Sequence, residues 1–328
     1  MTTEDVFQSI SLKKRFCKDN NLPITVFDTP YFYQRLEIIN NVIPCMDKFV
    51  EFSIELEDFK CEQDYFEYYN SIKDNVIDYL KNNKSFVNFN TRVIDTPKPH
   101  ISKKNLYIEE NDGKRFISLD MKKANFSALR FYDDAIFGGA ATWEEFISRY
   151  TDNEHIIGSK YIRQVIMGAC NPKRQIAQEK MLMFLLLDKI ITQLKLRQAH
   201  NSQSDIEAML SELEEFKVYS LGEDEIIIEV IGENGLEYYI KIINDIVSAT
   251  EYKDFIRITA FTLKKIQGTD GWMKYYYDSN IEFKCLNAEI FHQIIKHWLG
   301  LKITDDDLVF YHNGRLAKFL EPTVNPWG

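Results

Sequence analysis

The order of hydrophobic and polar residues predicts helices that alternate with pairs of antiparallel strands. Between residues 65 and 80, Ile72, Val76 and Leu80 recur every four residues, the spacing of a helix that buries one side. Similar spacing predicts further helices, and Thr142 followed by Glu145 is typical of a capped helix start. These further helices cover residues 30–36, 122–132, 142–150, 159–170, 173–198, 238–248 and 288–299.

Short runs in which hydrophobic and polar residues alternate predict the strands. One hairpin is expected around Asn111-Asp112-Gly113, a sequence typical of a tight turn. A second hairpin is expected around residues 222–225, which give it an acidic tip. Because helices are interspersed with antiparallel hairpins, we predict an α+β fold. The expected strands are residues 22–27, 105–109, 115–120, 216–221, 226–231, 255–263 and 272–277.

Prolines at positions 97 and 99 mark the best candidate for a boundary along the chain. Proline restricts the residue before it to extended conformations, so residues 96–100 are expected to be an extended link. We therefore expect an N-terminal α/β region at residues 1–100 and a core at residues 101–280. A C-terminal helical extension is expected at residues 281–328.

Composition limits the class of protein. The 328 residues are 45% hydrophobic and 27% charged, values that exclude a disordered chain. No apolar run reaches 18 residues, so no membrane span is expected, and the N-terminus does not resemble a secretory signal. The five cysteines are scattered and form no Cys-x-x-Cys pair, which argues against a disulfide framework or a structural zinc site. We expect a cytoplasmic protein, in the host cytoplasm if it is viral.

The net charge of −10 conceals a separation of charges along the chain. Residues 159–197 contain eight Lys or Arg and two acids, whereas residues 205–237 contain eleven acids and one base. A basic segment followed by an acidic one suits a site that handles both phosphates and metal cations. Two solvated helix surfaces of opposite charge would produce the same pattern.

Two acidic positions are the best candidates for chemistry. Asp120 ends an apolar strand that turns into a helix, and Asp224 lies between Glu223 and Glu225 at the tip of the second hairpin. If the two strands lie side by side, these carboxylates meet, and a cation must offset their repulsion. Two Mg²⁺ ions held by aspartates are what phosphoryl transfer requires. The alternative is an exposed acidic turn and an ordinary acid near a helix start.

These segments resemble the motifs of palm-domain nucleic acid polymerases of the A and B families. Residues 118–130, with Asp120, look like the first metal-binding motif, and residues 219–230, with Asp224, look like the third. The resemblance implies an antiparallel palm-like sheet with an acidic hairpin, flanking helices and a helical fingers-like segment. It also implies that Asp120, Asp224 and Glu225 are catalytic, and that Asp120, Asp224 and Glu223 bind Mg²⁺ or Mn²⁺.

The same resemblance assigns substrate-binding residues. The helix between the two motifs takes the place of the fingers helix, so its basic residues are expected to bind the incoming triphosphate. Residues 262–266 and Trp272-Met-Lys274 resemble the lysine-bearing strand beside the primer end in replicative and protein-primed polymerases. The implied substrate-binding residues are Lys160, Arg163, Arg174, Lys264 and Lys265.

The leading hypothesis is therefore a DNA polymerase-like nucleotidyltransferase that adds nucleotides to a nucleic acid 3′ end by two-metal phosphoryl transfer. Its partners would be nucleic acid and nucleoside triphosphates. The Ile-, Asn- and Lys-rich composition hints at an AT-rich, phage-like source. One alternative is a non-catalytic binding or assembly protein whose acidic hairpin contacts a partner. Another is a metal-dependent nuclease that uses Asp120-Met-Lys122.

Overall fold

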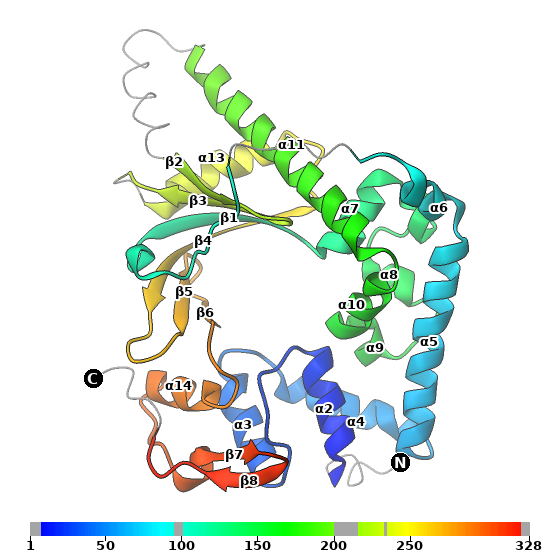
Figure 1. Cartoon of the computed structure of the whole chain (residues 1–328), viewed down its shortest axis with the longest axis vertical. Helices are drawn as coiled ribbons and strands as arrows, with labels where there is room; N and C mark the ends of the chain where they lie inside the picture. The colour runs from blue at the N-terminus through cyan, green and yellow to red at the C-terminus, as the bar shows by residue number, and fades with distance from the viewer. Residues whose placement is uncertain (1–7, 95–100, 200–215, 233–234, 323–328) are drawn as a thin grey trace.

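The structure, a computed structural model, describes residues 8–94, 101–199, 216–232 and 235–322. It contains a six-stranded antiparallel sheet, a two-stranded sheet near the C-terminal end, and many helices. In Figure 1 the large sheet lies on the left, and the helices cover its upper side and continue down the right of the molecule. The mixture of helices and antiparallel strands confirms the predicted α+β fold.

The large sheet has the strand order β2-β3-β1-β4-β5-β6, and each neighbouring pair is antiparallel. β1 is an interior strand because β3 pairs with one of its edges and β4 with the other. The strands are β1 (Arg115–Met121), β2 (Phe216–Leu221), β3 (Glu225–Val230), β4 (Ile256–Lys265), β5 (Trp272–Tyr276) and β6 (Ile281–Lys284).

Two helical connections join the first four strands. One leaves β1 and returns at β2, and the other joins β3 to β4, which makes a split βαβ arrangement. Three helices from these connections pack against one another and against the sheet. They are α7 (Ala124–Tyr132), α11 (Pro172–Ala199) and α13 (Leu236–Ser248).

The two sides of the sheet differ because alternate residues of a strand point to opposite sides. The side under α7, α11 and α13, which we call the covered face, is apolar and includes Ile117, Leu119, Ile226 and Ile228. The other side, which we call the polar face, holds Ser118, Asp120 and Glu225 at one end, and Lys274 of β5 opposite Leu263. Its remaining part is an aromatic cluster of Phe116, Tyr219, Phe261 and Trp272, packed against Leu106.

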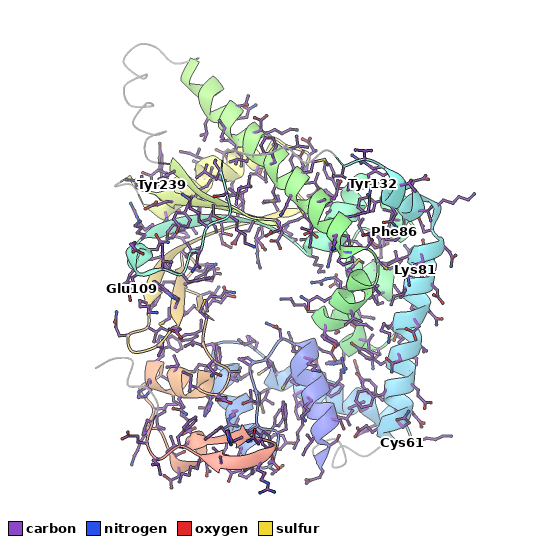
Figure 2. The ribbon with its side chains drawn as sticks, in the orientation of Figure 1. Cys61, Lys81, Phe86, Glu109, Tyr132 and Tyr239 are labelled. Carbon is purple, nitrogen blue, oxygen red and sulfur yellow. The ribbon has the colours of Figure 1, made fainter. Side chains whose placement is uncertain are left out.

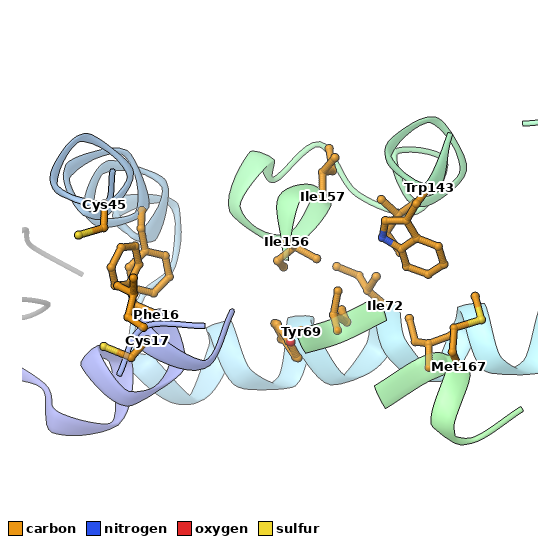
Figure 3. Packing of buried hydrophobic residues seen from close by; sticks show 14 of the residues in the cluster. Phe16, Cys17, Cys45, Tyr69, Ile72, Trp143, Ile156, Ile157 and Met167 are labelled. Atoms are coloured by element: carbon orange, nitrogen blue, oxygen red, sulfur yellow. The ribbon is translucent and has the colours of Figure 1, made fainter. Parts of the chain in front are cut away.

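The helical layer beside the sheet has a core of its own. Figure 3 shows part of it: Phe16 lies beside Cys45 at one side, Trp143 and Met167 lie at the other, and Tyr69 lies between them. Fully buried aromatic rings and Ile side chains dominate this core. Its helices are α2 (Ile10–Asp19), α3 (Tyr31–Asn40), α4 (Met46–Glu55), α5 (Glu62–Asn82), α6 (Lys84–Thr91), α8 (Trp143–Ile147), α9 (Glu154–Gly158) and α10 (Lys160–Gly168).

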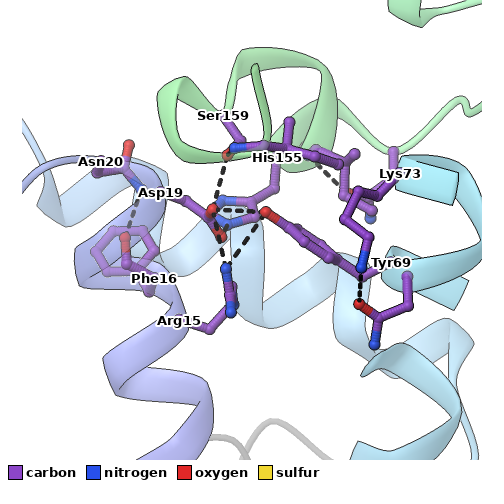
Figure 4. A network of polar contacts seen from close by, with 12 residues as sticks. Arg15, Phe16, Asp19, Asn20, Tyr69, Lys73, His155 and Ser159 are labelled. Carbon is purple, nitrogen blue, oxygen red and sulfur yellow. Dashed lines mark hydrogen bonds and ion pairs between the residues drawn. The ribbon is translucent and has the colours of Figure 1, made fainter. Parts of the chain in front are cut away.

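A buried carboxylate joins three of these helical segments (Figure 4). Asp19 at the end of α2 accepts hydrogen bonds from Tyr69 on α5, at 3.1 Å, and from Ser159, at 2.7 Å. Its second oxygen lies 3.0 Å from Nε2 of His155, and Arg15 lies 3.7 Å from the first. Every oxygen of this buried charge therefore has partners, as a stable core requires. The network is structural, and it fixes α2 against α10.

The C-terminal residues pack against the N-terminal ones. Helix α14 (Phe291–Trp298) contacts α3, and a hairpin follows it. The buried Arg35 of α3 donates a hydrogen bond to the carbonyl of Val309 in that hairpin. Its strands are β7 (Val309–His312) and β8 (Arg315–Lys318).

Some sequence-based predictions of the elements were wrong. Residues 105–109 form no strand and do not pair with 115–120, because both edges of β1 are already occupied by β3 and β4. Leu106 instead packs into the aromatic cluster of the polar face. Residues 22–27 form no strand, and β6 was not predicted. The second hairpin and the helices at residues 65–80 and 173–198 are confirmed.

The expected division at residues 100 and 280 stays a prediction. The core of the helical layer combines residues from all three expected regions, among them Phe16, Trp143 and Ile294.

Within the described ranges, no helix has both the length and the apolar character that crossing a bilayer requires.

Candidate functional site

The sheet brings the two acidic segments of the sequence together. β1 and β3 are antiparallel neighbours, and Asp120 is the register partner of Glu225. Asp224 immediately precedes β3, and its carbonyl accepts a 2.8 Å hydrogen bond from the amide of Met121. The expectation that these segments lie side by side is confirmed. The cause is the interior position of β1, which the hairpin β2–β3 joins along one edge.

Asp120 and Glu225 each have a polar partner on the polar face. Arg257, opposite Asp120 on β4, donates to its Oδ2 at 2.7 Å. Ser118 donates to Oε1 of Glu225 at 2.6 Å. Burial raises the pKa of Asp120, while the positive charge of Arg257 partly opposes that rise. Both carboxylates are thus oriented by neighbours in the sheet.

Asp224 lies close enough to Asp120 for their charges to interact. Burial raises the pKa of Asp224, and the negative charge of Asp120 raises it further. Like charges that are held together destabilise each other unless a cation lies between them. Negative charge is therefore concentrated at this end of the sheet.

Glu223 differs from its neighbours because two lysines neutralise it. Lys103 lies 2.5 Å from one carboxylate oxygen, and Lys180 on α11 lies 3.3 Å from the other. The hydrogen bond from Lys103 lowers the pKa of Glu223 to about 2. Its predicted part in metal binding stays a prediction, and it would have to exchange these lysines for the ion.

Sequence reasoning missed a further carboxylate in this cluster. Glu179 on α11 is only 7% exposed, and among the described residues no side chain forms a hydrogen bond or ion pair with its carboxyl group. Burial and the charges of Asp224 and Glu223 raise the pKa of Glu179 to about 7. The available signal was its position: Glu179 lies four residues before the buried Met183, on the apolar side of α11.

Asp120 opens into a pocket of about 370 Å³ at the starts of α7, α8 and β4. More basic side chains than acidic ones line this pocket. Lys122 donates to the carbonyl of Asp254 at 3.3 Å, and Lys123 pairs with Glu144. The charged lining residues are Asp120, Lys122, Lys123, Arg130, Asp254 and Arg257. Such a pocket attracts anions next to a carboxylate cluster that attracts cations.

The residues predicted to bind the triphosphate do not line this pocket. Lys160 is exposed at the start of α10. Burial lowers the pKa of Arg163, and the negative charge of Glu144 opposes that effect. Arg174 donates to the carbonyls of Phe89, at 2.8 Å, and Arg92, which ties α11 to α6. Their roles stay predictions, while the structure places other cations beside Asp120.

The predicted primer lysines lie at the far end of β4. Lys265 is eight residues along the strand from Arg257, a distance of roughly 26 Å at the rise of a β-strand. Its ammonium lies 4.9 Å from the centre of the Trp272 ring, and Lys264 is exposed. The structure thus separates both from Asp120, and their predicted contact with a primer stays a prediction.

Another lysine lies nearer to the carboxylates. Lys274 on β5 is 6% exposed, and its ammonium lies 4.4 Å from the centre of the Phe261 ring. Burial lowers the pKa of Lys274, and the charges of Glu225, Glu282 and Asp120 oppose that effect. The resemblance noted for Trp272-Met-Lys274 places this lysine beside a primer end, and that role stays a prediction.

The carboxylates suit a hard cation, although their present arrangement is incomplete. Oxygen donors are the ligands that Mg²⁺ and Mn²⁺ prefer. In the part of the chain that the structure describes, no three His, Cys, Asp or Glu side chains are grouped closely enough to hold an ion. The donor chemistry fits, and the ion would replace Arg257 as the counter-charge of Asp120.

Relatives add nothing to this description of the site. No protein-family model, no curated protein and no solved structure matches the chain.

Proposed function

We propose that this protein is a metal-dependent nucleotidyltransferase of the palm-polymerase type, which adds nucleotides to the 3′ end of a nucleic acid. The observation that supports it best is the pair of Asp120 and Asp224. The two acids lie on neighbouring segments, they repel each other, and one opens into a pocket lined by cations. Nucleotidyl transfer to a 3′ hydroxyl requires both features, since carboxylates hold the metal ions and cations bind the triphosphate, which loses pyrophosphate.

Each residue of the site then has a role. Asp120 and Asp224 would hold Mg²⁺ or Mn²⁺, with Glu225 or Glu223 assisting. The bound ion supplies activation of the 3′ hydroxyl and stabilisation of the leaving pyrophosphate. Ser118 orients Glu225 through its 2.6 Å hydrogen bond.

The cations of the Asp120 pocket would neutralise the triphosphate. Lys122, Lys123 and Arg130 line it together with Arg257. Arg257 is 63% exposed and holds Asp120 through one ion pair, so it can move to a phosphate when a metal ion takes its place. These residues replace Lys160, Arg163 and Arg174 as the first candidates for triphosphate binding.

Primer extension with Asp224→Asn tests this function. The substitution keeps the shape of the side chain but removes a charge from the cation site. Incorporation of labelled nucleotides by the wild type in Mg²⁺ or Mn²⁺ should fall by more than the roughly 10–100-fold that loss of an outer-shell partner costs. Asp245→Asn is the matched control, because Asp245 is exposed on α13, the helix over the covered face. That control should retain full activity.

Two other outcomes would contradict the proposal. Degradation of nucleic acid without added nucleotides would favour the nuclease, for which Asp120 and Lys122 line one pocket. A wild type that neither extends a primer nor gains thermal stability from either metal would favour a non-catalytic protein. The ion pair between Asp120 and Arg257 is the observation that favours this second candidate, since it already neutralises the first acid without a metal.

A further inference from the structure

A second cavity is distinct from the Asp120 pocket. It has a volume of about 1030 Å³ and lies between α2 with the segment that follows it, α10, β6 and the start of α14. No residue lines both cavities. The lining residue Glu282 is the register partner of Lys274, so the cavity borders the polar face of the sheet.

The charges of this cavity select for an anion. Three lysines line it, Lys14, Lys18 and Lys284. Its one carboxylate, Glu282, accepts a 2.6 Å hydrogen bond from Tyr276 and lies 2.6 Å from Lys284. The positive charges of Lys14 and Lys18 therefore remain without a carboxylate in the lining, although the net charge of the whole protein is −10.

Lys14 and Lys18 are held at the cavity without a carboxylate partner among the described residues. They are four residues apart on α2, so they share one side of the helix, and like charges at this spacing destabilise it. Lys14 lies 5.6 Å from the centre of the Phe27 ring, and Lys18 lies 5.8 Å from that of Tyr161. These contacts leave the N–H donors available, and a bound anion would relieve the repulsion.

The remaining wall of the cavity is largely apolar. Leu22, Ile24 and Phe283 line it, and Tyr161 adds an aromatic ring beside Lys18. A ligand that fits both parts has negative charges on one side and flat apolar groups on the other, as a nucleotide has. The volume is at the upper limit of the roughly 300–1,000 Å³ typical of small-molecule pockets, so it exceeds what one nucleotide needs.

We propose that this cavity binds consecutive nucleotides of a single-stranded nucleic acid. The phosphates contact Lys14 and Lys18, and the bases lie against the apolar wall and the ring of Tyr161, as in other single-strand sites. The choice of a nucleic acid over another anionic, partly apolar ligand rests on the proposed function.

Binding of a labelled single-stranded 12-mer, followed by fluorescence anisotropy in EDTA, tests the proposal without requiring catalysis. The double variant Lys14→Gln/Lys18→Gln should weaken binding by at least about tenfold. It should also reduce the slope of log K against log salt by about 1.4, the value for two lost phosphate contacts on a single strand. The matched control is Lys81→Gln/Lys84→Gln, two exposed lysines at the end of α5 and the start of α6. Figure 2 shows Lys81 on the side of the molecule away from the sheet. Equal weakening by both pairs would overturn the proposal.

Thiol modification gives a second measurement, independent of the lysine variants. Cys285 is exposed and lines the cavity, whereas Cys61 is exposed at the start of α5 and does not line it. The 12-mer should slow maleimide modification of Cys285 several-fold and leave Cys61 unchanged. Protection by a nucleoside triphosphate as strong as that by the 12-mer would overturn the assignment to a strand, and so would no protection by either.

The two proposals can fail separately. Asp224→Asn should bind the 12-mer and protect Cys285 as the wild type does, because Asp224 does not line the cavity. Normal binding without primer extension would contradict only the proposed function. Primer extension with no difference between the two lysine pairs would contradict only the strand site.

Discussion

The two faces of the large sheet consist of alternate residues of the same strands, yet they meet different requirements. Leu119 on the covered face is fully buried beneath helices, whereas its neighbour Asp120 on the polar face is ion-paired to Arg257 and opens into a pocket. Burial of apolar area stabilises the covered face without any need for directional contacts. The polar face instead keeps carboxylates and a lysine at a cost in desolvation. Consecutive residues of one strand thus serve the stability of the fold on one face and the candidate site on the other.

The largest expected effect tests the covered face. Leu119→Ala leaves a cavity under the helices, so we expect a loss of about 2–5 kcal/mol in the free energy of unfolding, measured by urea denaturation. The activity of each folded molecule should change little. Ser118→Ala, one residue earlier in β1, should show the opposite pattern, with a smaller loss of stability and weaker nucleotide incorporation. Equal effects of both variants on activity would contradict the conclusion that only the polar face takes part in the reaction.

An intermediate effect is expected from Glu179, whose carboxyl group interacts with Asp224 and Glu223 at the tip of the hairpin β2–β3. The pKa of Glu179 is about 7 in the folded protein, above the ordinary value of 4.5. Below pH 4.5 the carboxyl group is protonated in both the folded and the unfolded state, so its ionisation does not lower the free energy of unfolding. As the pH rises from about 4.5 through 7, the unfolded state releases its proton first, so stability falls with pH.

The variant Glu179→Gln should therefore stabilise the metal-free protein by on the order of 1–3 kcal/mol at pH 8 and have almost no effect at pH 4.5. Thermal melting at the two pH values, each in EDTA, measures the difference. Glu237→Gln, an exposed acid at the start of α13, provides the control and should show no such pH dependence. A Glu179 variant that is equally stable or less stable at pH 8 would contradict the interpretation.

The smallest effect concerns the ion pair on the polar face. Because Arg257 is largely exposed, Arg257→Gln should cost less than about 1 kcal/mol of stability. It removes the positive charge that competes with a metal for Asp120, so Mg²⁺ should raise the melting temperature more than in the wild type. Lys189→Gln, which breaks the exposed pair with Glu251, controls for loss of a surface charge. The same metal response in wild type and Arg257→Gln would argue against Asp120 as a ligand.

Much of the local structure was predictable from the sequence. The alternation in β1 and in the hairpin β2–β3 correctly located Asp120 at a strand end and Asp224 at the hairpin tip. The predicted hairpin at residues 105–120 failed because a turn signal specifies only a local bend. Whether the two flanking segments pair depends on which other strands compete for the same edges, and β3 and β4 occupy both edges of β1.

The sequence by itself determined the fold class and the two acidic segments, because helix and strand periodicity depend on neighbours within a few residues. Only the tertiary structure decided which charges surround these acids. Arg257 meets Asp120 through the pairing of β4 with β1, and Glu179 reaches Asp224 through the packing of α11. Lys264 and Lys265 are carried away from them by the antiparallel direction of β4. Contacts between residues far apart in the chain follow from strand order and helix orientation, which no local pattern records.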